Sequence, residues 1–532
     1  MEKHNKESSI LKRKKNKKTN TGHNENIENG TATLPSSAQF KSIFSTIDEN
    51  FGFINSILGK DIGLIEKKYF VFNDKYIMGL VYINSLTDQK LVSSQVIEPL
   101  LKASIDIRNS SDDILNIIQS KFIYIPTVSK SDQMKDIVYS LLNGSAILFI
   151  DEIESALIIE SRKVEKRAVE KPVNEVSTLA SMDSLTEDIT TNCNLIMKRL
   201  PTPDLQFEKF IVGKLSQTEV KLLWLEGIAN KKIIDEVRKR IQKINIDMVD
   251  GIGVLSELIV DSTMSVFATY KQSERPDVLT KGLSDGQFVI LCNNSPFGLL
   301  APVTFWDNFK TMDDYSEIPL SSCYLRLLRC TAFILAITIS PLYLAFVAYN
   351  HSIVPSTLAI NITTGREGVP FPSIVELLIV SLGLTIIREA SLRIPGTAGY
   401  FIGTLAAVVI GQAAVSAGYV SASLIIVVAV SYISTYAISS NTLLFSTRLI
   451  NIFLILLSGM FGIFGIINGL IIIIWHMVSL ESFGVPYMYP LVPFDFEGMK
   501  DTIIRAPFSV LKKRLRILSP YNRIRMNNNK DK

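Results

Sequence analysis

The sequence predicts a soluble N-terminal half of α+β or α/β type, made of two subdomains, followed by an all-α polytopic membrane domain. Two observations lead to this fold class. Up to about residue 320, charged residues are spread among short apolar runs of strand length, which is typical of mixed α/β domains. From residue 330 to 480 the chain is overwhelmingly apolar, in segments of about 20 residues, the length that spans a bilayer.

The soluble half is predicted to begin after a disordered, basic tail at residues 1–36. Residues 37–160 form the first α/β subdomain, and its four predicted strands are Tyr69–Phe72, Tyr76–Ile83, Phe122–Ile125 and Ala146–Ile150. A polar linker with several prolines covers residues 161–204. The second α/β subdomain occupies residues 205–320. Its predicted elements are strands near Phe207–Val212 and Glu219–Leu225 and an amphipathic helix near Lys231–Ile244.

The membrane domain is predicted over residues 321–490. Its five apolar segments are Cys330–Tyr349, Phe371–Ile387, Thr397–Ala417, Val420–Ile438 and Leu449–Leu480. Arg326 and Arg329, just before the first segment, place its start on the inner side. The fifth segment is too long for one straight crossing, because as a helix it would extend about 48 Å against about 30 Å of hydrocarbon. We therefore expect it to bend or to emerge along the surface.

The placement of charge predicts the topology. Eight Lys and Arg residues lie in residues 1–18 and nine in residues 505–532. Because such ends stay inside, we expect both termini, the soluble half and a basic C-terminal tail at residues 491–532 on the cytoplasmic side. The crossings must then be even in number, within a range of four to six: either one segment fails to cross or the fifth crosses twice. We favour the first, with Phe371–Ile387, which is short and carries Glu376, as a re-entrant or interfacial element.

Enzymatic chemistry is not expected. The chain has four histidines, and none lies in the predicted folded soluble half. Gly282–Gly286 matches the Gly-x-Ser-x-Gly pattern, but Ser284 has no histidine to activate it, so we interpret the motif as a polar turn. The pair Asp313-Asp314 is interpreted as a cap or turn. No phosphate-binding glycine loop and no cluster of metal ligands is present in the sequence, so we expect no cofactor and no metal.

The third apolar segment carries the most informative membrane pattern. Small residues recur every four positions and permit another helix to approach closely; they are Gly399, Gly403, Ala407 and Gly411. A mildly polar stripe runs beside them on the same helix; its residues are Thr404, Val408, Gln412 and Val415. This combination suits a helix that lines an oligomeric pore. The alternative, that Gln412 only bonds across two helices, stays open.

Two further patterns favour simpler interpretations. In the fifth segment Gly459, Gly462, Gly465 and Gly469 fall on one face of a helix, which indicates packing. Arg388, Glu389 and Arg393 stand at a membrane boundary, where long side chains commonly reach the headgroups.

An ordered set of short motifs resembles the GerA family of spore germinant receptors, A subunit. The residues that carry the resemblance in the membrane half are Pro370, Phe371, Pro372, Glu376, Arg388, Glu389, Arg393 and Pro395, followed by the run Val409–Val415. Further family-like stretches are Lys166–Pro172, Glu274–Asp277, Ser295–Phe297 and Ser482–Tyr487. Together they cover about residues 45–495 in the expected order.

The resemblance implies a subunit of a nutrient-sensing complex in the inner membrane of a dormant bacterial spore. It also implies a permease-like B subunit and a lipoprotein C subunit as partners, and homo-oligomers that form an ion channel whose opening starts germination. The basic tails are expected to contact anionic lipid, and nucleic acid is not expected as a partner. Two stretches depart from the family pattern, at Ser177–Asp183 and at Ser421–Ser423, which leaves a variant interface to the partner subunits open.

Three alternatives remain at this point. The chain could be a related component that transports or releases dipicolinic acid, a transporter that moves a solute itself, or a non-conducting membrane scaffold. Against the transporter stands the lack of two comparable, broken hydrophobic halves.

Overall fold

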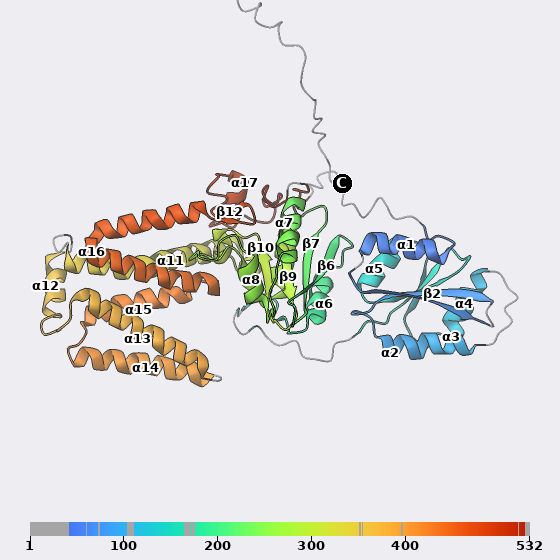
Figure 1. Cartoon of the computed structure of the whole chain (residues 1–532), viewed down its shortest axis with the longest axis horizontal. Helices are drawn as coiled ribbons and strands as arrows, with labels where there is room; N and C mark the ends of the chain where they lie inside the picture. The colour runs from blue at the N-terminus through green and yellow to red at the C-terminus, as the bar shows by residue number, and fades with distance from the viewer. Residues whose placement is uncertain are drawn as a thin grey trace, which may run out of the picture.

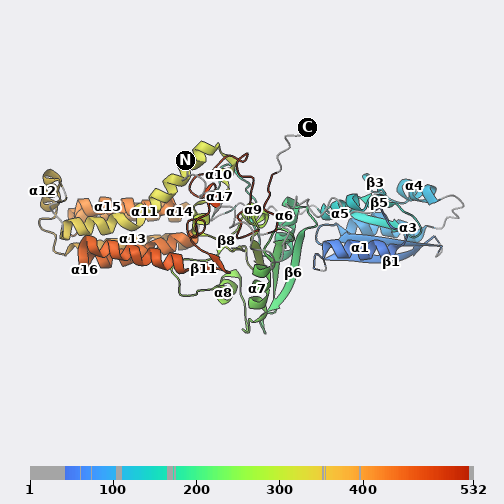
Figure 2. The same ribbon diagram turned by 90° about the horizontal axis from the view of Figure 1, so that it is seen from above.

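The computed structural model describes the chain in stretches separated by short gaps. They are residues 42–59, 61–72, 75–103, 111–163, 172, 175, 177–349, 353, 355–394, 397–519 and 521–526. Two α/β domains and a helical bundle lie in a row, in the order of the sequence (Figure 1), and the view from above shows the same row (Figure 2). The predicted fold class is confirmed. The tail at residues 1–36 lies outside the described residues.

The first domain is a five-stranded antiparallel sheet in the order β1-β2-β4-β5-β3. Its strands are β1 Leu64–Val71, β2 Tyr76–Ile83, β3 Val128–Ser131, β4 Ala146–Ile150 and β5 Ala156–Ile159. Its helices are α1 Ile47–Leu58, α2 Gln89–Val92, the π-helical turn η1 Ser93–Ile97, α3 Glu98–Lys102, α4 Ser111–Lys121 and α5 Met134–Leu142. Successive side chains of a strand point to opposite faces of the sheet, so β2 contributes to two cores. Val81 packs with α1 and α5 on one face, and Leu80 packs with α3 and α4 on the other.

The predicted strand at Phe122–Ile125 is wrong. This run follows α4, and its Ile123 and Ile125 are buried in the domain core. The backbone N–H of Tyr124 donates to the carbonyl of Gln95, which belongs to a helical turn, so the run is not part of the sheet. The edge strand is β3 a few residues later.

The second domain repeats the strand order of the first, β6-β7-β9-β10-β8, again fully antiparallel. Its strands are β6 Leu205–Val212, β7 Thr218–Leu225, β8 Lys271–Ser273, β9 Phe288–Cys292 and β10 Gly298–Ala301. Its helices are α6 Ile189–Arg199, α7 Lys231–Gln242, α8 Ile252–Ile259 and α9 Pro276–Asp285. In both domains one helix precedes the first strand and one helix lies between the third and fourth strands of the chain order, so the soluble half is a tandem repeat of one topology.

Helix α6 corrects the predicted linker at residues 161–204. Asp188 caps the helix by accepting hydrogen bonds from the backbone N–H groups of Thr190 and Thr191. Cys193 and Ile196 are buried in the core, and burial raises the pKa of the Cys193 thiol to about 12. Residues 189–199 therefore belong to the second domain, where α6 takes the place that α1 takes in the first.

One continuous apolar core joins the two domains. It combines α1 and α5 of the first domain with α6 and α9 of the second. Polar contacts lie around it: the Asn194 side-chain amide donates to the carbonyl of Ser85 at 2.9 Å, and the backbone N–H of Lys209 donates to Asp61 at 3.2 Å. The repeats thus share a buried interface.

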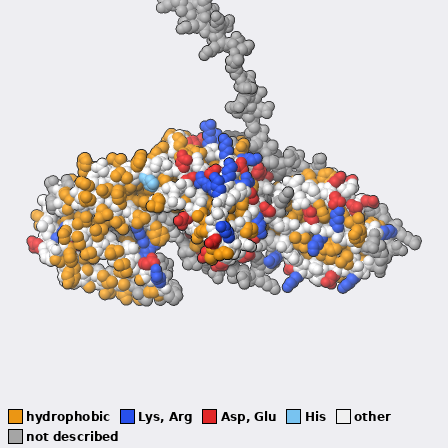
Figure 3. Space-filling model, viewed as in Figure 1, with side chains coloured by type: hydrophobic (Ala, Val, Ile, Leu, Met, Phe, Trp, Pro, Cys, Tyr) orange, Lys and Arg blue, Asp and Glu red, His pale blue; other side chains and the backbone are white. Residues whose placement is uncertain are grey.

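The C-terminal half is a bundle whose long helices run along a common direction, with the short α12 lying across the end that is far from the α/β domains (Figure 1). They are α11 Pro319–Ala348, α12 Ser356–Thr364, α13 Ser373–Arg393, α14 Thr397–Ser416, α15 Ala422–Tyr436 and α16 Asn441–Ser479. By length and composition, α11 and α16 are the two described helices that could cross a membrane. Hydrophobic side chains cover the visible face of the bundle, whereas charged ones gather on the α/β domains (Figure 3).

Helix α16 doubles back within the bundle. Gly462 has φ 59° and ψ −140°, where the helix direction reverses. A Cβ on Gly469 would lie 2.6 Å from a Leu454 side-chain carbon, whereas these residues would be about 22 Å apart on a straight helix. The expected bend is confirmed, and its form is a hairpin. Helix α13, in contrast, is unbroken over Ser373–Arg393, and the interpretation of Phe371–Ile387 as a re-entrant or interfacial element stays a prediction.

The C-terminal segment, residues 480–526, returns to the second domain instead of forming a free basic tail. It contains the short strands β11 Glu481–Ser482 and β12 Val485–Pro486 and the helix α17 Phe496–Met499. The Phe483 ring lies 5.0 Å from the ring of Phe288, between centroids. Ser519 is fully buried and donates to the carbonyl of Asp285 at 2.8 Å. The predicted tail at residues 491–532 is therefore wrong for its described part.

Candidate functional site: a charged junction between the second domain and the bundle

Short elements connect the second domain to the bundle. The 3-10 helix η2 Phe305–Phe309 and the helix α10 Asp313–Ser316 lead directly into α11. The C-terminal segment packs against both, since the backbone N–H of Phe305 donates to the carbonyl of Tyr487 and the backbone N–H of Arg505 donates to Sγ of Cys323. The way into the bundle and the way out of it therefore meet at one place.

Buried ion pairs hold this junction together. Asp314 is fully buried and accepts from Arg326 Nε at 2.9 Å and from Arg329 at 2.8 Å. Arg326 is fully buried as well, and its Nη1 donates to Asp501 of the C-terminal segment at 2.8 Å. The hydroxyl of Tyr315 donates to Asp501 at 2.9 Å. Two arginines of α11 are thus fixed to carboxylates from both sides of the junction.

Loss of any one partner from this buried network is energetically costly. Moving charges out of water is costly, and the pairing offsets that cost only while every partner is present. Removing one partner of a buried pair costs about 3–5 kcal/mol. Because Arg326 and Asp501 are far apart in sequence, the pair makes the position of α11 depend on the C-terminal segment.

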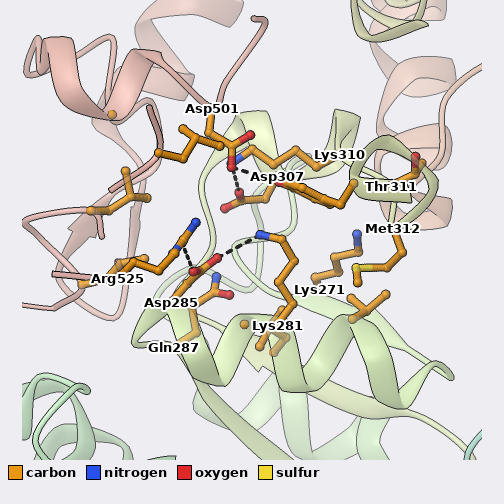
Figure 4. A pocket seen from close by; sticks show the side chains of 18 of the residues that line it. Lys271, Lys281, Asp285, Gln287, Asp307, Lys310, Thr311, Met312, Asp501 and Arg525 are labelled. Carbon is orange, nitrogen blue, oxygen red and sulfur yellow. Dashed lines mark hydrogen bonds and ion pairs between the residues drawn. The ribbon is translucent and has the colours of Figure 1, made fainter. Parts of the chain in front are cut away.

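A pocket of about 90 Å³ opens beside this network, between α9, η2 and the C-terminal segment (Figure 4). Nine charged side chains contribute to its wall; they are Lys271, Lys281, Lys310, Lys513, Arg525, Asp285, Asp307, Glu497 and Asp501. Lys281 pairs with Asp285 at 3.0 Å, and Arg525 reaches the same carboxylate. Lys310 pairs with Asp307 at 2.8 Å. Most of the charges are compensated across the pocket.

The pKa values of these groups reflect the compensation. Burial raises the pKa of Asp501, but Lys310, Lys281 and Arg326 outweigh burial and hold that pKa well below its ordinary value. Burial lowers the pKa of Lys281, but Asp285 and other acidic neighbours outweigh it and raise the pKa above its ordinary value. Both groups are therefore charged at neutral pH.

The sequence contained part of this site without revealing its arrangement. The sequence pattern assigns Arg326 and Arg329 to topology and Asp314 to a cap or turn; in the structure they form the centre of the junction. Asp313 does anchor a turn, because it accepts from the backbone N–H groups of Leu179 at 3.2 Å and Ala180 at 3.1 Å. The stretch that departs from the family pattern, Ser177–Asp183, thus lies on the junction.

Ser284 is part of a helix end. It lies in the last turn of α9, which ends at Asp285 and is capped by Gly286, so the motif is the end of a helix and not only the predicted polar turn. Its hydroxyl donates to the carbonyl of Lys281 at 2.7 Å. Within the part of the chain that the structure describes, no three His, Cys, Asp or Glu side chains are grouped to hold a metal ion.

The predicted pore stripe lies on α14, at the outer edge of the bundle (Figure 1). Val408 is 60% exposed and Gln412 is exposed, whereas Val415 is half-buried. The side chain of Thr404 lies outside the described residues. No part of the described chain covers the side of α14 on which Val408 and Gln412 lie, and its role as a pore lining stays a prediction.

The small-residue ladder is used within the chain at two of its positions. A Cβ on Gly403 would lie 2.5 Å from the hydroxyl of Ser391, so α13 packs against α14 at Gly403. A Cβ on Gly411 would lie 3.9 Å from Ile425, so α15 contacts α14 at Gly411. Ala407 is half-buried. The side-chain surroundings of Gly399 lie outside the described residues. Contact between subunits through this ladder stays a prediction.

The family-like residues of the membrane half lie at opposite ends of α13. Pro370, Phe371 and Pro372 are exposed where the chain enters the helix. Glu376 is buried in its first turn and accepts from the backbone N–H of Ser421 at 2.6 Å. The second stretch that departs from the family pattern, Ser421–Ser423, therefore lies directly on this glutamate.

The other end of α13 carries charges. Arg388 stacks on the ring of Tyr436, with 5.1 Å between the guanidinium carbon and the ring centroid. Glu389 pairs with Arg393 at 2.9 Å, and both side chains are exposed. Pro395 lies outside the described residues.

Two α/β domains followed by a bundle of apolar helices define the class of a membrane protein with a large soluble half. The model of the family described as Bacillus/Clostridium GerA spore germination protein matches residues 53–517. The chain belongs to this family.

Individual relatives agree with that assignment. The chain is 37% identical over 435 residues to spore germination protein GerLA of Bacillus cereus, covering 82% of this chain and 88% of that protein. It is 33% identical over 448 residues to spore germination protein KA of Bacillus subtilis, covering 84% and 82%. An uncharacterized membrane protein of B. subtilis, YfkQ, is 34% identical over 435 residues, covering 82% and 84%.

Among solved structures, the chain is similar to the crystal structure of the N-terminal domain of the A subunit of the Bacillus megaterium spore germinant receptor GerK3. The two are 28% identical, with a TM-score of 0.39, and the match covers 50% of this chain and 98% of that one.

Proposed function

We propose that this chain is the A subunit of a nutrient germinant receptor in the inner membrane of a bacterial spore. It works with a permease-like B subunit and a lipoprotein C subunit, and copies of it associate through the bundle into an ion channel that nutrient opens. Membership of the spore germination family supports the receptor role. The channel role is supported by the uncovered face of α14 in the bundle.

The observation that carries the channel proposal is the uncovered face of α14. Val408 and Leu405 are 60% and 53% exposed, and the amide of Gln412 is exposed beside them. An amide facing hydrocarbon loses its hydrogen bonds to water, which is costly. Water in a pore or a polar group of a neighbouring subunit would satisfy it, and the valines would form an apolar constriction that resists wetting when closed.

The arrangement of the helices supports an even number of crossings. Helices α11, α13, α14, α15 and the two arms of α16 give six passes along the bundle, and the chain enters and leaves at the end that faces the second domain (Figure 1). Both termini and the soluble half then lie on the side of the spore core. The junction at Asp314 and Arg326 connects the soluble half to α11 and is the route by which a nutrient signal reaches the bundle.

Substitution of the stripe valines tests the channel in spores. Val408→Ser and Val415→Ser should ease wetting of the closed pore, which would release cations and start germination without nutrient. Ile410→Ser is the matched control, because Ile410 is 56% exposed on the same helix and lies about 160° around it from Gln412. Normal protein levels with no nutrient-independent cation release at either valine would contradict the pore assignment.

A further inference from the structure

Within the described part of the bundle, two arginines have no counter-charge. Nε and one terminal nitrogen of Arg448, and one terminal nitrogen of Arg388, are buried and without a hydrogen-bond partner. Among the described residues neither arginine has an ion pair, whereas Arg366 and Arg393 pair with Glu376 and Glu389. A charge inside an apolar bundle is costly unless it is paired, and it commonly marks a binding site.

The two guanidinium groups flank one pair of aromatic rings. Arg388 lies 5.1 Å from the ring centroid of Tyr436, and Arg448 lies 5.6 Å from that of Tyr432. The two tyrosine rings are 5.5 Å apart. Helix α13 and the start of α16 thus each place one cation against the pair of tyrosine rings that α15 carries.

A small cavity of about 50 Å³ adjoins Arg448 and Tyr432. Hydroxyl groups line it, but several donate their hydrogens to their own helices: Thr385 to the carbonyl of Ser381, Thr435 to that of Tyr432, and Thr447 to that of Leu443. Their oxygens can accept from the guanidinium through water, yet they bring no negative charge. An anion is required to neutralise the arginines.

We propose that Arg388 and Arg448 bind the phosphate group of an anionic membrane lipid. A guanidinium presents paired donors that match phosphate oxygens, and basic pockets between membrane helices bind lipid headgroups. The site lies where α15 ends and α16 begins, at the end of the bundle that faces the second domain (Figure 1), which is the headgroup level if the bundle crosses a membrane as proposed above. Tyrosines are also typical of that level.

Apolar surface beside the arginines suits the acyl chains. Phe445 and Ile452 of α16, which lie about one turn before and one turn after Arg448, are 59% and 43% exposed, and Ile452 also lines the cavity. A free anion would use the arginines and leave these side chains uncovered. A lipid accounts for the charge and for the apolar surface together.

Thermal unfolding of the purified full-length chain in a neutral detergent tests the site. Phosphatidylglycerol at saturating concentration should raise the Tm of the wild-type protein by about 3 °C or more, and phosphatidylcholine should not. Arg448→Gln and Arg388→Gln should each lose most of the shift. Arg393→Gln is the control, because Arg393 lies on the same end of α13 but is exposed and paired with Glu389; it should keep the shift.

Three results would overturn the proposal: an undiminished shift in both arginine variants, an equal shift with phosphatidylcholine, or a full shift with inorganic phosphate alone, which would assign the site to a free anion. If Arg448→Gln does not fold, Arg448→Lys keeps the charge without the planar donors and should weaken the shift. Because the readout is lipid-dependent stability, a chain that binds the lipid but conducts no ions would refute the channel and leave this site intact.

Discussion

At the scale of single residues, Gly462 has the largest effect on the path of the chain. Its backbone, at φ 59° and ψ −140°, lies in a region that is essentially restricted to glycine. Cβ and Cγ of Tyr349 lie 3.2 Å from the position that a Cβ would take, which is a tight contact. The backbone conformation at this turn therefore requires glycine, and the space beside it is narrow.

Gly462→Ala should destabilise the bundle by about 2 kcal/mol or more, from backbone strain and contact with Tyr349. Gly383→Ala is the matched control: Gly383 lies within α13, no atom lies within 4 Å of its Cβ position, and alanine favours a helix by about 1 kcal/mol. Thermal unfolding of both variants in detergent measures the difference. Equal melting temperatures would show that the hairpin turn does not depend on glycine.

Asp501 gives the junction a dependence on pH. Its pKa lies below the ordinary value of 3.8 in the folded protein, so its ion pairs contribute their full stability above pH 3.8. This contribution is lost as the pH falls below 3.8 towards the lowered pKa, because protonation removes the charge that Arg326 contacts. Protection of residues 494–526 from hydrogen exchange should therefore fall in that range.

Asp501→Asn should remove this acid-dependent loss and lower the protection already at neutral pH. Asp48→Asn, which changes an exposed carboxylate of the first domain, should leave the profile of the C-terminal segment as in the wild type. A wild-type profile in Asp501→Asn would mean that other contacts hold the segment.

At the scale of elements, the hairpin of α16 makes the number of passes along the bundle even, which supports the proposed topology. With six passes, the α12–α13 loop lies at the far end of the bundle, and the C-terminal segment lies beside the second domain (Figure 1). Ser519 is buried and unsuitable for labelling, whereas Arg516, Glu367 and Lys121 are exposed. These three positions report on the two sides of the membrane.

Single cysteines at Arg516 and at Lys121 should react with an impermeant reagent from one side of oriented vesicles, and a cysteine at Glu367 from the other. The wild-type chain measures the background of its own four cysteines. Labelling of Arg516→Cys and Lys121→Cys from opposite sides would require an odd number of crossings.

Local sequence patterns predicted the elements whose form depends on their own residues. The strands Tyr76–Ile83 and Ala146–Ile150 have the predicted bounds, because their apolar residues are buried on both faces. Helix α6 was missed because its sequence is polar on one face and its core contacts come from α9, many residues later. The length of α16 predicted a bend, but the hairpin was not the favoured option, because its two arms are stabilised by contact with each other.

The candidate site was predictable only in part, because it too depends on contacts between residues that are far apart in the sequence. The sequence shows Arg326, Arg329 and the acidic pair at residues 313–314 close together, but their third partner, Asp501, lies on the returning C-terminal segment. The charges of that segment predicted a solvated tail. In the structure Arg514 donates to the carbonyl of Ser284, and Arg525 pairs with Asp285. The site depends on ion pairs and hydrogen bonds between residues far apart in the sequence, and the spacing of residues along the chain does not reveal them.

At the scale of the whole molecule, three parts are joined by two different interfaces. The two α/β repeats share an apolar core, which favours movement as one body. The second repeat and the bundle meet instead through the buried ion pairs of Asp314, Arg326 and Asp501, with aromatic packing of Phe267, Phe305 and Tyr487 beside them. If the soluble half receives a signal, as the proposed function requires, that signal reaches α14 through this second interface.

The leak predicted for the stripe valines is measured most directly as cation efflux from liposomes that contain the purified chain. If copies of α14 surround a pore, Val408→Ser should raise K⁺ efflux well above that of the wild type, because a hydroxyl in place of an apolar side chain favours wetting of the constriction. Ile410→Ser should behave as the wild type. Equal efflux from Val408→Ser, Ile410→Ser and the wild type, at matched protein content and oligomer size, would contradict the claim that this chain forms an ion channel lined by α14.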